Sequence, residues 1–176
     1  MRLFTAVPVP AELRERMAAL GKEIRQEGIV PVKPENMHLT LKFLGETDER
    51  KLAGLEQALR GIRFAPFSCI VKGVGVFPDE HYIKVVWAGV ESGGKLEALA
   101  KDVQQPLRGF GDDERFSAHI TIARVKRRAD LRQFLEKHRN DEFGAFTVSS
   151  FELIQSVLGP EGPKYSTIAE FEAGAF

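Results

Sequence analysis

Two short stretches decide the fold of this chain, His38-Leu39-Thr40-Leu41 and His119-Ile120-Thr121-Ile122. In both, polar and aliphatic residues alternate, which is the pattern of a strand with one face in a core. Residues two apart on a strand project from the same face, so each His shares a face with its Thr. The sequence therefore predicts two strands that each present an imidazole and a hydroxyl on a surface backed by aliphatic packing.

Each stretch lies within a strand–helix–strand–helix–strand series. Apolar residues at helical spacing predict helices, and alternating or β-branched runs predict strands. The first series comprises a strand at 3–7, a helix at 11–27, a strand at 38–44, a helix carrying Leu52, Leu55 and Leu59, and a strand at 67–77. The second comprises a strand at 82–90, a helix at 95–105, a strand at 117–126, a short helix with Leu131, Phe134 and Leu135, and strands at 146–158 and 164–171.

This repeated order predicts an α+β fold with internal pseudo-twofold symmetry. We expect one domain spanning residues 1–176, built as two pseudo-symmetric lobes, each with an antiparallel sheet flanked by helices. The lobes are expected near residues 1–78 and 79–176, with the boundary at Pro78-Asp79-Glu80 and the active-site cleft between them.

Composition excludes several classes of protein. The 176 residues carry 25 Lys and Arg against 25 Asp and Glu, so a bulk polyanion binder is excluded and RNA contact requires a local basic patch. The single cysteine, Cys69, can form neither an internal disulfide nor a thiolate zinc site, and its apolar neighbours predict a small buried side chain. No run approaches the ~18 apolar residues of a membrane span. We expect a cytoplasmic protein without a membrane partner.

The paired motifs suit phosphodiester hydrolysis without a metal. Two imidazoles with ordinary pKa values near ~6.5 can be one neutral and one protonated close to neutral pH, as a general base and a general acid require. The hydroxyls of Thr40 and Thr121 can donate hydrogen bonds to the non-bridging phosphate oxygens, where negative charge concentrates in the transition state. By symmetry, the residues alone do not tell which histidine is the acid.

Other readings of the histidines have less support. No Cys, Asp or Glu stands at a fixed ligand spacing beside His38 or His119, so a zinc site is disfavoured. We expect His81 on the surface at the start of a strand and His138 partly buried on the last helix. Neither a Gly-x-Ser-x-Gly signature nor a phosphate-binding glycine loop is present.

The sequence around both motifs resembles that of the 2H phosphoesterase superfamily. Within this superfamily it resembles the bacterial and archaeal RNA 2′,3′-cyclic phosphodiesterases, also called 2′-5′ RNA ligases. The resemblance covers nearly the whole chain. It is carried by Val32-Lys33-Pro34-Glu35-Asn36-Met37-His38-Leu39-Thr40-Leu41-Lys42-Phe43-Leu44-Gly45, by Phe116-Ser117-Ala118-His119-Ile120-Thr121-Ile122-Ala123-Arg124-Val125, and by Ser156-Val157-Leu158-Gly159-Pro160-Glu161-Gly162-Pro163-Lys164-Tyr165.

The resemblance implies that RNA ending in a 2′,3′-cyclic phosphate is opened to a 2′-phosphomonoester. It implies His38 as proton donor, His119 as proton acceptor, and Thr40, Thr121 and Arg124 in substrate binding, without cofactor or metal. Its substrates would be RNA ends, with tRNA halves as candidates, and we expect a monomer. Joining such ends through a 2′-5′ bond would be reversal of transesterification, because no ATP-binding motif is present.

Supporting residues follow from strand parity. Lys42 shares the face of His38 and could favour a phosphate, whereas Phe43 is expected in the core. Arg124 reaches the cleft only if its strand ends or bulges after His119. The run Lys126-Arg127-Arg128 is either a solvated turn or a contact for the RNA backbone, and Tyr165 is a candidate for base stacking.

The residues leave three alternative functions open. One is a phosphodiesterase for a small nucleotide such as ADP-ribose cyclic phosphate or 2′-5′ oligoadenylate. The second is a non-catalytic binder of RNA ends, which would need only one positive group and not two His and two Thr. The third is a metal-dependent hydrolase, which chelator sensitivity would reveal.

Overall fold

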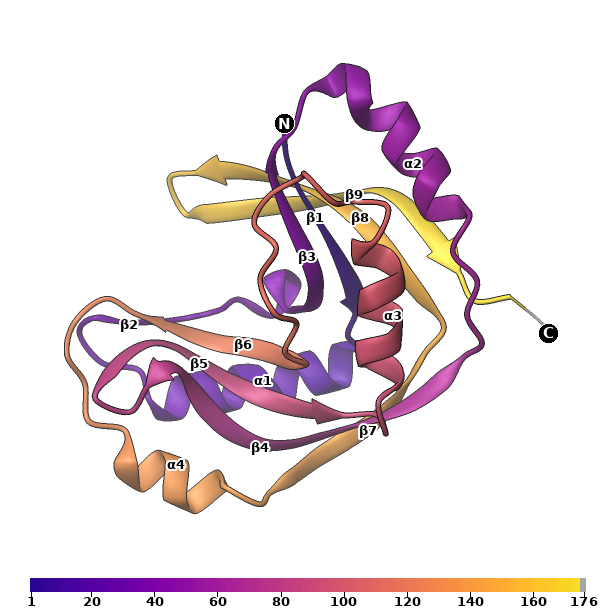
Figure 1. Ribbon diagram of the computed structural model, residues 1–176. Coiled ribbons are helices and arrows are strands. Elements are labelled where there is room, and N and C mark those ends of the chain that lie inside the picture. The colour runs from indigo at the N-terminus through magenta and orange to yellow at the C-terminus, as the bar shows by residue number, and fades with distance from the viewer. Residues whose placement is uncertain (175–176) are drawn as a thin grey trace.

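Alternating segments of the chain build two antiparallel sheets in the computed structural model, which describes residues 1–174 (Figure 1). The first sheet has the order β3 (His38–Glu46), β1 (Arg2–Pro8), β8 (Ser150–Gly159) and β9 (Gly162–Glu172). The second sheet has the order β2 (Ile29–Pro31), β6 (His119–Val125), β5 (Tyr82–Glu91), β4 (Phe67–Asp79) and β7 (Glu142–Val148). The predicted α+β class is confirmed, and each motif begins the strand expected to carry it.

The two sheets repeat one arrangement by exchanging strands. The order β3-β1-β8-β9 has the same plan as β6-β5-β4-β7, because each motif strand flanks the first strand of its own half. The third strand in each row, β8 or β4, comes from the opposite half of the sequence. The sheets therefore do not coincide with residues 1–78 and 79–176. The expected boundary at Pro78–Glu80 covers the last two residues of β4 and the first residue of the turn into β5, and these two strands pair within one sheet.

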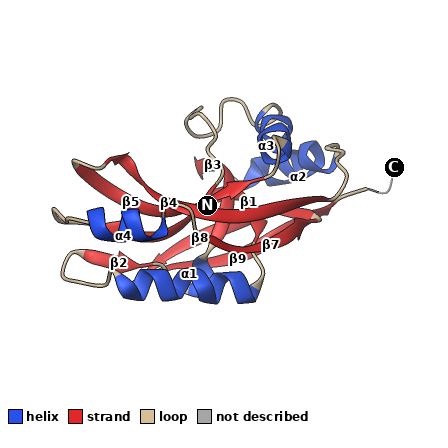
Figure 2. Cartoon of the chain, turned by 90° about the horizontal axis from the view of Figure 1, so that it is seen from below, coloured by secondary structure: helices blue, strands red, loops and turns tan. Residues whose placement is uncertain are grey.

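The helices are exchanged as well. Helix α1 (Ala11–Glu23) packs on β6 and β2 of the second sheet, although it leaves β1 of the first. Helix α3 (Lys95–Gln104) packs on β3 of the first sheet, although it leaves β5 of the second. Helix α2 (Leu52–Arg60) contacts β9, and α4 (Arg132–His138) contacts β4. Figure 2 shows α2 and α3 together on one side of the molecule and α1 on the other.

One apolar core joins these layers and fixes the motif strands. Leu39 and Ile120 are 0% exposed, and so is Ile122, so the aliphatic half of each motif is buried as predicted. Burying each such side chain contributes about 1.5–3 kcal/mol. This packing holds the backbone under each His and Thr. Within residues 1–174, no helix combines the length and the apolar character needed to cross a bilayer.

Three features of the secondary structure differ from the prediction. Helix α1 ends at Glu23 and not at 27, because Ile24 leaves helical geometry and is 6% exposed in the core. The single strand expected at 146–158 is two strands, β7 and β8, which pair with β4 and β1 in different sheets. The edge strand β2 was not predicted, since three residues are too few to show a pattern. A 3-10 turn at Pro34–Asn36 and another at Glu49–Lys51 complete the elements.

Candidate active site

Each motif strand contains a bulge just after its Thr. In β3, Thr40 pairs with Ala6 and Lys42 with Thr5, so Leu41 is the extra residue. In β6, Thr121 pairs with Trp87 and Ala123 with Val86, so Ile122 is the extra residue. Both strands consequently show the same burial sequence, with two consecutive buried residues after the Thr and an exposed one next.

The bulges reverse the strand parity beyond each motif. Arg124 therefore lies on the face of His119 and is exposed there, which meets the condition under which it was expected to reach the cleft. Phe43 takes the equivalent place after His38 and is 56% exposed, so its predicted core position is wrong. Lys42 turns away from the His38 face and its side chain is 3% exposed, so its predicted orientation is wrong too. The pseudo-symmetry thus places a phenyl ring on one sheet where it places a guanidinium on the other.

His119 is held in one tautomer by the backbone. Its Nδ1 lies 2.8 Å from the Ser117 carbonyl oxygen, which can only accept, so Nδ1 carries the proton and the Nε2 lone pair is free. The rings of Phe77 and Trp87 lie 5.0 and 6.4 Å away between centroids. Burial lowers the pKa of His119 and the nearby Arg124 charge lowers it further, while the Ser117 carbonyl raises it. An imidazole with a low pKa and a free Nε2 has the properties of a general base.

His38 has a matching environment on the first sheet. Its ring lies 6.2 Å from Phe4 and 5.7 Å from Tyr165 between centroids. Burial lowers the pKa of His38, and the charge of Arg14 lowers it further, while the Asn36 carbonyl, two residues earlier as in the other motif, raises it. The His38 Nδ1 is buried and has no hydrogen-bond partner among the described residues. The Asn36 carbonyl thus acts on His38 with a geometry that falls short of a full hydrogen bond, in contrast to the 2.8 Å contact between Ser117 and His119.

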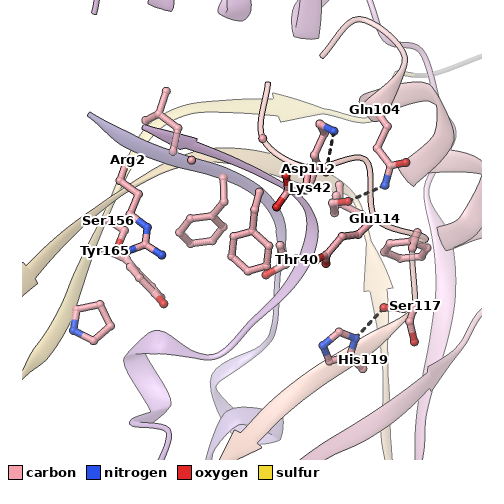
Figure 3. A pocket seen from close by; sticks show the side chains of 18 of the residues that line it. Arg2, Thr40, Lys42, Gln104, Asp112, Glu114, Ser117, His119, Ser156 and Tyr165 are labelled. Carbon is pink, nitrogen blue, oxygen red and sulfur yellow. Dashed lines mark hydrogen bonds between the residues drawn. The ribbon is translucent and has the colours of Figure 1, made fainter. Parts of the chain in front are cut away.

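A pocket of about 680 Å³ lies where β3 and β6 contact each other. Figure 3 shows Thr40, His119 and Tyr165 pointing into it from three sides. The residues lining it include Arg2, Phe4, Thr40, Lys42, Phe43, Gln104, Glu114, Arg115, His119, Arg124, Ser156 and Tyr165. His38 and Thr121 do not line it but adjoin it. His38 packs against Tyr165, and Thr121 lies between His119 and Arg124 on the same face of β6.

The connection between α3 and β6, residues 105–118, closes one side of the pocket. The Lys42 Nζ lies 2.8 Å from Asp113 Oδ1 and donates a second hydrogen bond to the Asp112 carbonyl oxygen at 3.4 Å. The ion pair holds the pKa of Asp113 below its usual range. Gly111 has a φ of +61°, and a Cβ there would overlap the carbonyl of Phe43. The bulge in β3 is thus pinned to the segment that delivers the Ser117 carbonyl to His119.

Several lining residues gave no signal in the sequence. Arg2, Gln104 and Glu114 belong to no motif and reach the pocket only through long-range packing. Asp113 likewise becomes informative only beside Lys42. The resemblance alone drew attention to Tyr165 and Ser156.

The remaining candidate side chains lie elsewhere. His138 is 7% exposed, with Nδ1 2.7 Å from Asp141 and Nε2 3.0 Å from Glu23, a bridge that ties α4 to α1. His81 is exposed in the β4–β5 turn, as predicted. Cys69 is 0% exposed, and burial raises the pKa of its thiol to about 11, so it is a poor nucleophile. In the described part of the chain, no group of three or more His, Cys, Asp or Glu side chains is arranged to hold a metal ion.

Comparison with known families bears directly on this geometry. The model of the family described as LigT like Phosphoesterase matches residues 7–87 and 89–165. The chain belongs to this family. As a LigT-like phosphoesterase, and so a member of the 2H superfamily, it is an enzyme, and the resemblance stated from its sequence is confirmed.

Relatives and solved structures agree with the assignment. The chain is 42% identical to an RNA 2′,3′-cyclic phosphodiesterase of Archaeoglobus fulgidus, over 98% of this chain and 100% of that protein. It is 35% identical to one of Methanocaldococcus jannaschii, over 97% and 100%. The crystal structure of TT0787 of Thermus thermophilus matches with a TM-score of 0.83 at 35% identity, covering 98% of this chain and 97% of that one. E. coli LigT complexed with 3′-AMP matches with a TM-score of 0.83 at 25% identity, covering 99% and 98%.

Proposed function

We propose that this LigT-like phosphoesterase hydrolyses 2′,3′-cyclic phosphate ends of RNA to 2′-phosphomonoesters, without a metal. The observation that carries the proposal is the facing of two His-x-Thr strands, β3 and β6, across one pocket, with the His119 Nε2 lone pair left free. The full-length relatives named RNA 2′,3′-cyclic phosphodiesterase support the substrate.

The proposed reaction is one in-line displacement at phosphorus. His119 Nε2 removes a proton from water as its oxygen attacks, a new P–O bond forms, and the bond to the 3′-oxygen breaks. Protonated His38 donates its proton to the departing 3′-oxygen, so the two imidazoles exchange protonation states over the step. Thr40 and Thr121 donate hydrogen bonds to the non-bridging oxygens, and Arg124 balances their charge.

The broken symmetry of the two sheets supports one orientation of the substrate. Phe43 is exposed on the first sheet, and its ring lies 5.9 Å from that of Phe4, whose ring is 5.0 Å from Tyr165. Arg124 occupies the equivalent place on the second sheet. In this proposal the base stacks on the aromatic side and the phosphates lie toward Arg124. The proposed substrates include RNA ends such as those of tRNA halves. The protein would act as a cytoplasmic monomer, and it would also catalyse the reverse reaction, the 2′-5′ joining of RNA ends.

The proposal is tested by incubating the protein with a short RNA bearing a 2′,3′-cyclic phosphate in excess EDTA and identifying the product isomer. A 2′-phosphate is expected, because the 3′-oxygen leaves. Product that forms only after metal is added would contradict the two-histidine mechanism. Turnover of ADP-ribose cyclic phosphate or 2′-5′ oligoadenylate, without turnover of RNA, would indicate a small-nucleotide phosphodiesterase. Binding of the RNA end without any product would indicate a non-catalytic binder.

We expect kcat/KM to follow a bell-shaped curve against pH. Its optimum should lie at a lower pH than the optimum of two imidazoles with ordinary pKa values. Activity falls with falling pH as His119 gains a proton, and falls with rising pH as His38 loses its own. Both pKa values are lowered from 6.5 in the free enzyme, so both limbs shift to lower pH. Arg124→Gln should raise the pKa of His119 and move the acidic limb to higher pH. Rate–pH titrations of the two proteins check this, and a wild-type profile still rising in alkaline solution would contradict it.

A further inference from the structure

Strand β6 continues past Arg124 to a second exposed cation. Val30 pairs with Arg124 and Ile29 with Val125, and the Lys126 amide donates a hydrogen bond to the Gly28 carbonyl oxygen at 2.7 Å, which extends the same register. Exposure alternates through residues 123–126, so Lys126 projects from the face of Arg124. At 3.3–3.4 Å per residue, roughly 7 Å of strand separates the two side chains.

Arg127 differs from its neighbour. Its guanidinium forms a salt bridge with Glu27, and its stem packs against Gly28, where a Cβ would lie 2.7 Å from the Arg127 Cβ. In the described residues, no carboxylate lies within salt-bridge distance of Lys126 or Arg124. Within the basic run, Arg127 is thus committed to a protein contact and Lys126 keeps its charge for another partner.

The same face carries an exposed apolar residue between the cations and the sheet edge. Val30 is 47% exposed and stands directly across from Arg124 on the edge strand β2. Cross-strand partners share a face, so Val30, Arg124 and Lys126 form one surface, which we call the β6 track. One end of the track, Arg124, lines the pocket, and the other lies outside it. Two cations beside a small apolar surface match an alternation of phosphates and sugars.

We propose that the β6 track binds the RNA chain leaving the pocket, with Lys126 contacting the phosphate on the 5′ side of the terminal nucleotide. This rests on the proposed function and makes its preferred substrate an oligonucleotide of at least two nucleotides. The zero net charge of the chain requires RNA affinity to come from such a local feature.

The test compares Lys126→Gln with Arg127→Gln, since each removes one positive charge from adjacent positions. The substrates are a 2′,3′-cyclic mononucleotide and a tetranucleotide with a 2′,3′-cyclic end, assayed over a range of KCl concentrations. We expect Lys126→Gln to raise KM for the tetranucleotide and to lower the slope of log(kcat/KM) against log[salt] by about 0.7–1, the contribution of one phosphate contact. Turnover of the mononucleotide should not change, and Arg127→Gln should match wild type on both substrates.

Equal effects of the two substitutions, or no effect of Lys126→Gln on the tetranucleotide, would overturn the track. Fluorescence anisotropy of a labelled tetranucleotide with a 3′-phosphate gives the same comparison without turnover. The anisotropy measurement therefore tests whether the β6 track binds RNA even if the wild-type protein hydrolyses neither substrate. An absence of hydrolysis would contradict the proposed function alone.

Discussion

Replacement of His119 by Ala is expected to reduce kcat for a cyclic-phosphate RNA end by about 10²-fold or more, the usual contribution of a general base. His38→Ala is expected to cause a loss of similar size by removing the general acid. Neither should change KM strongly, because the proton transfers occur in the transition state. Steady-state kinetics on the purified variants, with circular dichroism to verify folding, measure both losses.

His81→Ala provides the matched control, since this imidazole is exposed in the β4–β5 turn and should be dispensable. The double variant His38→Ala/His119→Ala should be little worse than either single variant, because groups that act as one unit are non-additive. A near-normal rate in either single variant would show that its imidazole transfers no proton. A double variant losing the product of the two single factors would mean that they act independently.

Replacement of Thr40 or Thr121 by Val is expected to cost roughly 1–4 kcal/mol of transition-state stabilisation, appearing mainly in kcat. Val keeps the branched shape of Thr and removes only the hydroxyl, so the strand packing should survive. Ser at either position should restore most of the rate, because it returns the donor. Kinetics of the Val and Ser pairs at saturating RNA give the comparison.

Thr147→Val is the control for these substitutions, because Thr147 is an exposed strand residue on β7, in the edge strand of the second sheet. Thr40 lines the pocket and Thr121 adjoins it, so a larger effect at Thr40 would fit the structure. If Val lowered kcat no more at Thr40 than at Thr147, the hydroxyl would not stabilise the transition state.

Local patterns predicted the strands of the site but not the residues just beyond them. His38 and Thr40 are correctly placed on one face because alternation is a property of the strand itself. The bulge at Leu41 depends on how β3 pairs with β1, and this pairing is not visible in residues 38–44. Counting parity through the bulge therefore misplaced Lys42 and Phe43. The presence of the same bulge in β6 is what carries Arg124 to the pocket.

The arrangement of the strands was also beyond local patterns. Val148 and Phe151, both 0% exposed, stand on either side of Ser149-Ser150, and this pair of polar residues is too short to mark the passage from one sheet to the other. The halves repeat the same order of elements whether or not they exchange strands, because the periodicity of each strand is unaffected by its partner. Only long-range pairing distinguishes the two arrangements.

The exchange of strands has a consequence for the order in which the chain can fold during synthesis. The second sheet uses residues 29–148, all of which are made before β8. Strand β1 is made first, yet Arg2–Ala6 wait for residues 152–156 before their second edge is paired. Loop closure over such a separation is slow, and an unpaired strand edge is open to wrong partners in the meantime. The pocket, whose lining includes Ser156 and Tyr165, is completed only after the β8–β9 hairpin has left the ribosome.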